Sequence, residues 1–177
     1  MDRGFVVWLT GLPASGKTTV ARELEDELRG RGLRVEVMDG DEVRKGLSRD
    51  LGFSKEDREI HAMRVAYVSK LLSRNGVAVI VALISPYRSF RQAIREDIEH
   101  FIEVFVRCPV EECAKRDPKG LYAKAFAGEV KDFTGVDDPY EDPDSPELVL
   151  DTVEEETAES VDKVLAWLAE HGYLNSR

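Results

Sequence analysis

Apolar residues occur along this chain in two patterns, short continuous runs and helical repeats. A short continuous run bounded by turn residues is typical of a strand that is buried on both faces of a sheet. The run at residues 77–84 has no polar alternation, so we expect it inside a parallel sheet with both faces covered. The other runs that predict strands lie at residues 5–9, 33–38, 101–106 and 148–150.

Between these runs, apolar residues recur every three or four positions, which predicts amphipathic helices. Gly30 and Gly32 end the first helix, Ser54 is a suitable N-cap for the second, and Asn75-Gly76 ends it. Alternating strands and helices predict an α/β fold in three layers, with a doubly wound, mainly parallel sheet of five strands. The apolar helix positions are Val20, Leu24, Leu28, Val65, Val68, Leu71, Leu72, Val161, Val164, Leu165 and Leu168.

A glycine-rich segment lies where the first strand gives way to the first helix. It reads Gly11-Leu12-Pro13-Ala14-Ser15-Gly16-Lys17-Thr18, which fits the P-loop pattern in the context that the pattern requires. The glycines let main-chain N–H groups point at phosphate oxygens, Lys17 supplies a charge for the β- and γ-phosphates, and the Thr18 hydroxyl is placed to bind Mg²⁺. We therefore expect ATP or GTP to bind through Gly11, Ala14, Ser15, Gly16, Lys17, Thr18 and Thr19.

Composition limits what else the chain does. Its 177 residues suit a single domain over residues 1–177, and a formal charge of −10 argues against binding nucleic acid or an anionic membrane surface. Cys108 and Cys113 have no metal partner at ligand spacing, which fits two reduced thiols. Because the sequence shows no secretory signal and no apolar run of membrane-spanning length, we expect a cytoplasmic protein.

P-loops serve hydrolases, switches and kinases alike, so other residues must indicate the acceptor. The chain has no Asn-Lys-x-Asp guanine motif, and its strand at residues 77–84 ends without a Walker-B aspartate. Carboxylates follow the second strand instead, in Asp39-Gly40-Asp41, where one could orient Mg²⁺ through water or accept a proton from an attacking hydroxyl. A turn and a helix N-cap are the alternative for one of them. These features favour a kinase for a small molecule.

Basic side chains gather between the second strand and the long helix, although the chain is acidic overall. Arg58 and His61 are three residues apart, which places them on one helix face, and Phe53 could stack on a base just before that helix. Arginine forks suit phosphate and sulfate because they donate two parallel hydrogen bonds. Ordinary ion pairs on a solvated helix are the alternative. The cluster comprises Arg44, Lys45, Arg49, Arg58 and Arg64.

Residues 117 to about 146 are rich in Gly, Pro, Asp and Lys and show little periodicity. Long irregular segments of compact domains are often lids or binding loops. We therefore expect residues 117–138 to close over substrate, with hinging at Gly120, Gly128 and Gly135. We interpret most carboxylates of residues 129–159 as a solvated acidic surface.

Several further motifs are specific when taken together. They are Asp39-Gly40-Asp41 with Val43-Arg44, Asp50-Leu51-Gly52-Phe53-Ser54 with Glu56-Asp57-Arg58, Ile84-Ser85-Pro86-Tyr87, Arg116-Asp117-Pro118-Lys119-Gly120-Leu121-Tyr122, Phe133-Thr134-Gly135 and Pro146-Glu147-Leu148. With residues 11–19, they make the chain resemble adenylyl-sulfate kinases over nearly its whole length. The resemblance implies transfer of the γ-phosphate of ATP to the 3′-hydroxyl of adenylyl sulfate, with Mg²⁺, in a homodimer.

The resemblance also implies roles for single residues. Asp41 is the expected base or water-linked metal carboxylate beside the 3′-hydroxyl, and Asp39 is expected to bind substrate beside it. The remaining implied roles place Arg44 and Arg58 on the phosphosulfate, Phe53 and Phe133 on the two faces of the acceptor adenine, Ile84 and Ser85 along the pocket, Lys119 in the lid and Arg116 near the ATP adenine.

Ser85 matches a position that this family is described as using for a phosphoserine intermediate. We favour a helix N-cap, since Pro86 follows where a first helical residue would stand, or else a contact with substrate. Direct in-line transfer needs no phosphoenzyme.

Two positions depart from the family pattern, which has Asn where His61 stands and Arg where Met63 stands. His61 shares a face with Arg58, so we expect it in the acceptor site, where its charge varies with pH. We predict a weaker or more pH-dependent affinity for the acceptor. Met63 falls on another face, where we expect an effect on packing only.

Two alternatives to this function stay open. The first is a P-loop kinase for another acceptor, such as a nucleoside, a sugar acid or another adenylated anion. The second is a non-catalytic nucleotide-binding regulator. The presence of Lys17, Thr18 and Asp41 argues against the second.

Overall fold

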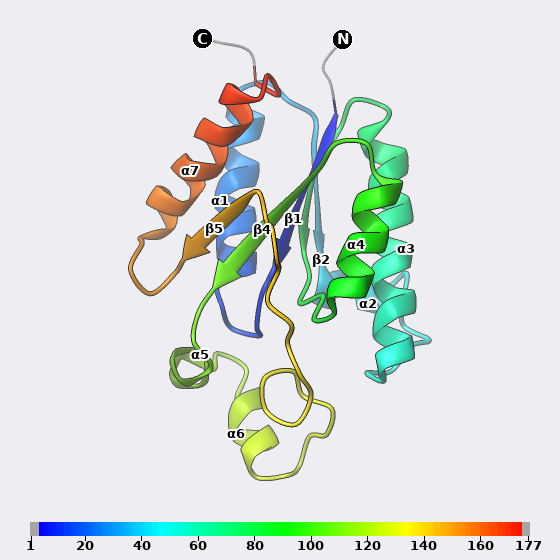
Figure 1. Cartoon of the computed structure of the whole chain (residues 1–177), viewed down its shortest axis with the longest axis vertical. Helices are drawn as coiled ribbons and strands as arrows, with labels where there is room; N and C mark the ends of the chain where they lie inside the picture. Colours follow the sequence, from blue (N-terminus) through cyan, green and yellow to red (C-terminus); the bar gives the residue numbers. More distant parts are fainter. Residues whose placement is uncertain (1–3, 175–177) are drawn as a thin grey trace.

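Five parallel strands form one sheet in the computed structural model, which describes residues 4–174 (Figure 1). Their order is β2-β3-β1-β4-β5, and every neighbouring pair is parallel. The predicted doubly wound α/β fold is confirmed, and the run at residues 77–84 forms a strand inside the sheet whose residues are all buried. The strands are β1 (Phe5–Thr10), β2 (Val35–Asp39), β3 (Ala78–Ala82), β4 (Phe101–Arg107) and β5 (Leu148–Asp151).

Helices cover both faces of this sheet. Alternate residues of β1 point to opposite faces, so Val7 packs with α1 and α7, whereas Val6 packs with α3 and α4 (Figure 1). All five strands point the same way, so their carboxyl ends lie together at one end of the molecule (Figure 1). The helices that cover the two faces are α1 (Lys17–Gly30), α3 (Lys55–Ser73), α4 (Arg88–Asp97) and α7 (Thr157–Glu170).

Three short helices lie at the carboxyl ends of the strands, namely α2 (Gly40–Lys45), α5 (Val110–Arg116) and α6 (Leu121–Phe126). The expectation of an irregular lid is therefore wrong for part of it, because α6 lies within residues 117–138. A helix of six residues shows too little periodicity to be predicted. Its Tyr122 and Ala125 bury themselves with Cys113 and Phe133 in a small apolar cluster separate from the two sheet cores. The lid thus has a core of its own.

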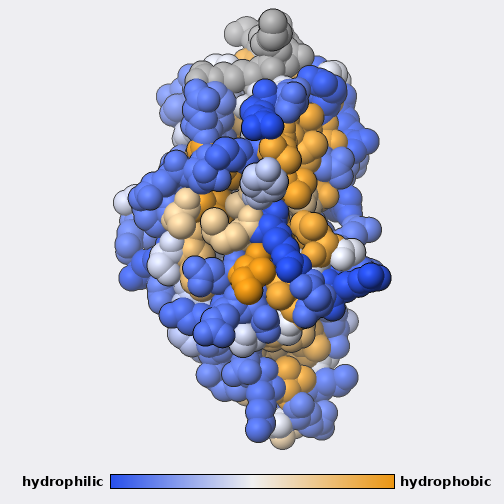
Figure 2. Space-filling model, turned by 90° about the vertical axis from the view of Figure 1, so that its right-hand side faces the viewer, coloured by the Kyte–Doolittle hydropathy of each residue, from blue (hydrophilic) through white to orange (hydrophobic). Residues whose placement is uncertain are grey.

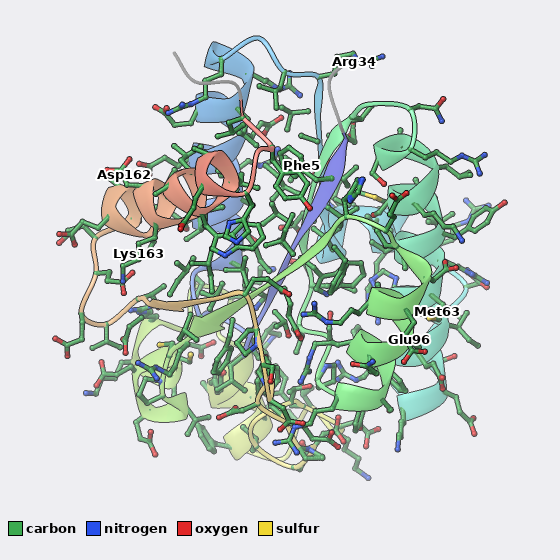
Figure 3. The ribbon with its side chains drawn as sticks, turned by 45° about the horizontal axis from the view of Figure 1, so that its top comes forward. Phe5, Arg34, Met63, Glu96, Asp162 and Lys163 are labelled. Carbon is green, nitrogen blue, oxygen red and sulfur yellow. The ribbon has the colours of Figure 1, made fainter. Side chains whose placement is uncertain are left out.

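The outer face of α3 carries several exposed apolar side chains. Figure 2 shows apolar patches among charged groups on the side of the molecule that bears α3 and α4. Met63 points outward from α3 (Figure 3) and lies beside Ile60 and Tyr67, which agrees with its predicted place off the Arg58 face. Among the helices of residues 4–174, none is both long and apolar enough to cross a membrane.

Candidate active site

The glycine-rich loop curls tightly between β1 and α1, and two of its glycines are required by that shape. A Cβ atom at Gly11 would lie 2.4 Å from the carbonyl oxygen of Val106 on β4. Gly16 has a φ of 105°, a conformation that residues with side chains rarely adopt. Because it directly precedes α1, the main-chain N–H groups of the loop and the positive end of that helix face the same space.

Lys17 is buried at the start of α1, and its ammonium group folds back onto the loop. Its Nζ donates to the carbonyl oxygens of Gly11 (2.9 Å) and Leu12 (2.6 Å). Burial lowers the pKa of Lys17 to about 8, and the nearby carboxylates of Asp39 and Asp41 offset only part of that effect. A polyphosphate is a stronger acceptor than two carbonyl groups, so this ammonium can turn to it.

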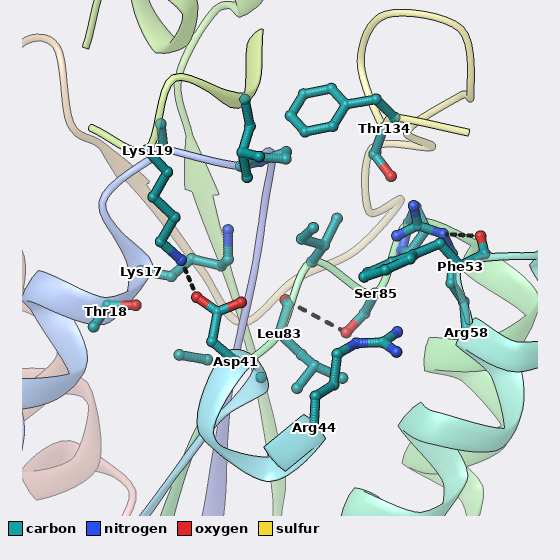
Figure 4. A pocket seen from close by; sticks show the side chains of 18 of the residues that line it. Lys17, Thr18, Asp41, Arg44, Phe53, Arg58, Leu83, Ser85, Lys119 and Thr134 are labelled. Carbon is teal, nitrogen blue, oxygen red and sulfur yellow. Dashed lines mark hydrogen bonds and ion pairs between the residues drawn. The ribbon is translucent and has the colours of Figure 1, made fainter. Parts of the chain in front are cut away.

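The two aspartates that follow β2 do different things. Asp39 is the N-cap of α2, since one carboxylate oxygen accepts from the main-chain N–H of Asp41 (3.1 Å), and its other oxygen accepts from the Thr18 hydroxyl (2.7 Å). Asp41 points into the open space, where it forms an ion pair with Lys119 of the lid (Figure 4). The cap interpretation of this motif therefore applies to Asp39, whereas Asp41 lies on the cavity wall and is paired with Lys119.

A cavity of about 460 Å³ joins the loop to these aspartates and to the region beneath the lid. Every residue that we predicted for substrate binding lines it, and Ala14, Lys17 and Thr18 of the loop do as well. The predicted substrate residues on its wall are Asp39, Asp41, Arg44, Phe53, Arg58, His61, Ile84, Ser85, Lys119 and Phe133.

The far end of the cavity carries two guanidinium groups against one exposed aromatic ring. Phe53 is 57% exposed, and its ring centroid lies 4.5 Å from Arg44 and 5.7 Å from Arg58. Burial and the charge of Arg58 lower the pKa of Arg44. Arg58 also donates to the main-chain oxygens of Phe53 (2.9 Å) and Asp132 (2.6 Å), which ties α3 to the lid. Two adjacent cations in a partly buried pocket favour an anion.

Other members of the basic cluster are not part of this pocket. Arg64 makes two hydrogen bonds to Asp50 (2.6 and 2.9 Å), and its guanidinium lowers the pKa of that carboxyl to about 2. Lys45 and Arg49 are exposed and do not line the cavity. The alternative of ordinary surface pairing thus applies to Arg64, whereas Arg44 and Arg58 face the ligand space.

His61 lines the same pocket, one turn along α3 from Arg58. The side chain is 4% exposed, and among the described residues neither ring nitrogen has a hydrogen-bond partner. Burial, with the charges of Arg44, Arg64 and Arg58, lowers the His61 pKa to about 4. The imidazole is therefore neutral near pH 7, and the change of its charge with pH that we expect falls near pH 4.

Ser85 is not a helix N-cap, contrary to one of our two expectations for it. Helix α4 begins at Arg88 with Tyr87 as its N-cap, and Ser85 has a left-handed backbone with a φ of 47°. The hydroxyl is buried and accepts from the indole N–H of Trp8 (2.9 Å). Proline at position 86 thus extends a turn rather than starting a helix.

Arg116 contacts the glycine-rich loop and does not line the cavity. Its guanidinium donates to the main-chain oxygens of Ser15 (3.4 Å) and Thr152 (2.6 Å), and the Thr152 hydroxyl donates to the same Ser15 oxygen (2.7 Å). Thr152 therefore supports the loop. No sequence pattern indicated this role, because Thr152 follows a strand of only four residues.

Sequence reasoning also missed part of the cavity wall. Thr134 lines it, and its buried hydroxyl lacks a partner among the described residues. The motif Phe133-Thr134-Gly135 could have indicated this residue, because Phe133 beside it was predicted to bind substrate. Within residues 4–174, all non-glycine residues with a left-handed backbone line this cavity, which concentrates strain at the site. They are Ala14, Ser85, Asp117 and Asp132.

A phosphate-binding loop that opens into a second, cationic pocket on a doubly wound parallel sheet defines a P-loop kinase. The sequence profile of the adenylylsulphate kinase family matches residues 3–151. An adenylyl-sulfate kinase of Picosynechococcus sp. is 52% identical over 97% of this chain and 97% of its own length. The chain therefore belongs to the adenylyl-sulfate kinase family.

Solved structures agree with this assignment. The Mycobacterium tuberculosis APS kinase, in complex with AMPPNP and APS, superposes with a TM-score of 0.92 at 42% identity, covering 96% of this chain and 99% of that chain. A probable bifunctional SAT/APS kinase of Sorangium cellulosum is 55% identical over 98% of this chain, which spans only 30% of that relative. A gluconokinase from Sinorhizobium meliloti, at 21% identity, shares the fold alone, with a TM-score of 0.61 over 96% of this chain and 93% of its own.

Proposed function

We propose that this chain transfers the γ-phosphate of ATP to the 3′-hydroxyl of adenylyl sulfate, giving ADP and 3′-phosphoadenylyl sulfate. The observation that carries the proposal is the continuous cavity from Lys17 to the guanidinium pair of Arg44 and Arg58. It offers one site for a polyphosphate and another for a second anion. The kinase domain would span residues 1–177, with residues 117–138 as its lid.

On the donor side, the loop amides and Lys17 hold the β- and γ-phosphates, and Arg116 supports the loop near the ATP adenine. Asp41 accepts the proton of the attacking 3′-hydroxyl. Its ion pair with Lys119 must open for this step, and the ammonium group is then free for the phosphate oxygens. In-line transfer between two bound substrates requires positioning and charge stabilisation rather than a covalent intermediate.

Residues where the donor side of the cavity meets the acceptor side suit a bound Mg²⁺ ion. The Thr18 hydroxyl and the Asp39 carboxylate are in contact (2.7 Å), and Asp41 lies on the same cavity wall. Mg²⁺ prefers hard oxygen ligands, keeps several waters and needs only one or two carboxylates, so this set suits it. When bound, the ion neutralises charge on the transferring phosphate. We propose Thr18 as a direct ligand and Asp41 as one that acts through water.

On the acceptor side, Arg44 and Arg58 bind the phosphosulfate, since guanidinium forks match both groups. Phe53 and Phe133 stack on the adenine, and Ile84 with Ser85 forms the pocket floor. The Ser85 hydroxyl already accepts from Trp8 and is buried, which supports a contact or structural role over a phosphoserine.

Product identification tests the proposal. The purified protein is incubated with Mg-ATP and adenylyl sulfate, and the position of the new phosphate on the ribose is determined by NMR. A panel with a nucleoside, a sugar acid and another adenylated anion gives the specificity. Faster ADP formation with one of those acceptors would show that the chain is a kinase for that acceptor. Nucleotide binding without any transfer would show that it is a non-catalytic regulator.

The cellular location and the oligomeric state of the protein are also proposals. We propose a cytoplasmic enzyme, supported by Cys108 and Cys113, which are buried free thiols. We also propose the homodimer that the family resemblance implies. A neighbour at 34% identity and a TM-score of 0.77 is described as a hexameric APS kinase from Thiobacillus denitrificans. Light scattering coupled to size exclusion measures the assembly directly.

A further inference from the structure

Arg91 is a buried arginine that does not line the substrate cavity. It lies on the inner face of α4, is only 2% exposed, and its Nε pairs with the buried Glu103 of β4 (2.9 Å). Removing a guanidinium from water is costly, so the group must use its remaining donors well. Both terminal nitrogens donate to main-chain carbonyl oxygens, one of Ser85 (2.5 Å) and one of Glu141 (2.5 Å).

The first of these carbonyls belongs to the floor of the acceptor pocket. Ser85 holds a left-handed backbone, a conformation that costs free energy in a residue with a side chain. Buried donors surround this turn, since the Thr10 hydroxyl donates to the carbonyl of Ile84 (2.6 Å) and Trp8 donates to the Ser85 hydroxyl (2.9 Å). Within residues 4–174, Arg91 is the charged side chain that donates to the Ser85 carbonyl of this turn. The strained floor is thus held from below.

The second carbonyl belongs to residues 138–147, which we call the return strap because they lead from the lid back to β5. The Tyr140 ring lies 5.7 Å from the Arg91 guanidinium, and its hydroxyl bonds to Thr10 (2.8 Å). The main-chain N–H of Glu141 donates to the carbonyl of Pro86 (2.8 Å). Strap and pocket floor therefore lie side by side, with one guanidinium between them.

We propose that Arg91 is a positioning residue that couples the pocket floor to the return strap, so that the acceptor site keeps its shape only while the strap is docked. A planar fork bridges two carbonyls at once, which an ammonium on a flexible stem does less well. The kinetic side of the proposal rests on the proposed function. Its structural side, the docking of the strap, does not.

The experiment compares Arg91→Lys with Arg95→Lys. Arg95 lies one turn along α4 and bonds the same Glu103 (3.0 Å), but its other partner is Glu147, the last strap residue before β5, rather than the pocket floor. We expect Arg91→Lys to raise the acceptor KM by about tenfold, as for loss of a buried charged hydrogen bond, with nucleotide affinity unchanged. Arg95→Lys is expected to leave the acceptor KM within about twofold, since it spares the floor and the strap contacts at Tyr140 and Glu141.

Hydrogen exchange at the Glu141 amide gives a readout that needs no turnover. Faster exchange there in Arg91→Lys, with amides of β3 unaffected, supports the coupling even if adenylyl sulfate proves not to be the acceptor. Unchanged exchange at Glu141, or an equal rise in acceptor KM in both variants, overturns it. If Arg91→Lys does not fold, Tyr140→Phe serves instead, because it removes the strap's bond to Thr10, and the same two outcomes decide.

Discussion

The donor half and the acceptor half of the cavity are built in different ways. The donor half is one contiguous loop whose polar groups satisfy each other, as when Lys17 bonds the carbonyls of Gly11 and Leu12. The acceptor half comes from α2, α3, the end of β3 and the lid. It contains the buried polar atoms of His61 and Thr134, which have no hydrogen-bond partner within residues 4–174. The hydrogen bonds of the donor loop are satisfied without ligand, as suits an element that binds any nucleotide. The unpaired groups of the acceptor half can discriminate between ligands, because only the correct ligand forms hydrogen bonds with them.

The largest effect should come from removing the charge of the donor half. We expect Lys17→Ala to lower kcat by on the order of 10²–10³-fold, as for the loss of one preorganised group that stabilises transition-state charge. Single-turnover phosphate transfer measures this. Lys115→Ala is the matched control, because Lys115 is exposed, pairs with Glu112 of its own helix and does not line the cavity. Equal activity of the two variants would show that the loop is not the donor site.

The next effect should be confined to the acceptor half. We expect Arg58→Lys to raise the acceptor KM by about 10- to 100-fold, since a bidentate and stacked guanidinium is not replaced by an ammonium. Nucleotide affinity, measured by calorimetry, should stay unchanged. Arg64→Lys is the control, because Arg64 pairs with Asp50 outside the cavity. A similar loss of nucleotide affinity in Arg58→Lys would remove the division between the two halves.

A change of pH should separate the halves more gently. Burial lowers the pKa of Lys17 to about 8, so the ammonium that binds phosphate is lost above that pH. We expect nucleotide affinity to be constant below pH 8 and to fall by up to about tenfold per unit above it, because binding then requires uptake of a proton. Lys17→Arg, whose charge persists, should bind with a flat profile over the same range. A flat profile in the unchanged protein would contradict the prediction.

The smallest effect is expected at His61. His61→Asn should change the acceptor KM by about two- to fivefold, the size of one neutral hydrogen bond, and by the same factor from pH 6 to pH 8. The imidazole is already neutral there, since its pKa is about 4. Initial rates at several pH values measure the ratio. An inflection of that ratio near pH 6.5 would mean that the ring is charged in the free protein.

The same contrast explains what could be predicted from the sequence. The loop at residues 11–18 was predictable because its function depends on residues that are adjacent in the chain. The pocket around Phe53 and Arg58 became predictable through motifs of a family, since the spacing alone left surface ion pairs open. The Arg64 pair with Asp50 shows that this alternative applied to part of the cluster.

Other features needed three dimensions. The turn at Ser85 looked like a helix start, because Ser-Pro is common there, but tertiary donors from Trp8 and Arg91 hold it in another conformation. The neutral state of His61 depends on burial by residues far apart in sequence. Helix α6 was too short for its periodicity to be recognised. Local patterns contain none of these influences.

The contact between Lys119 and Asp41 has a consequence for the idle enzyme. A carboxylate that an ammonium already engages is not free to take a proton from water. With ATP bound and no second substrate, a water molecule near the phosphates therefore meets an Asp41 carboxylate that is already engaged. We expect spontaneous hydrolysis of the nucleotide to stay slow until an incoming ribose separates the two side chains, which conserves the cell's ATP when activated sulfate is scarce.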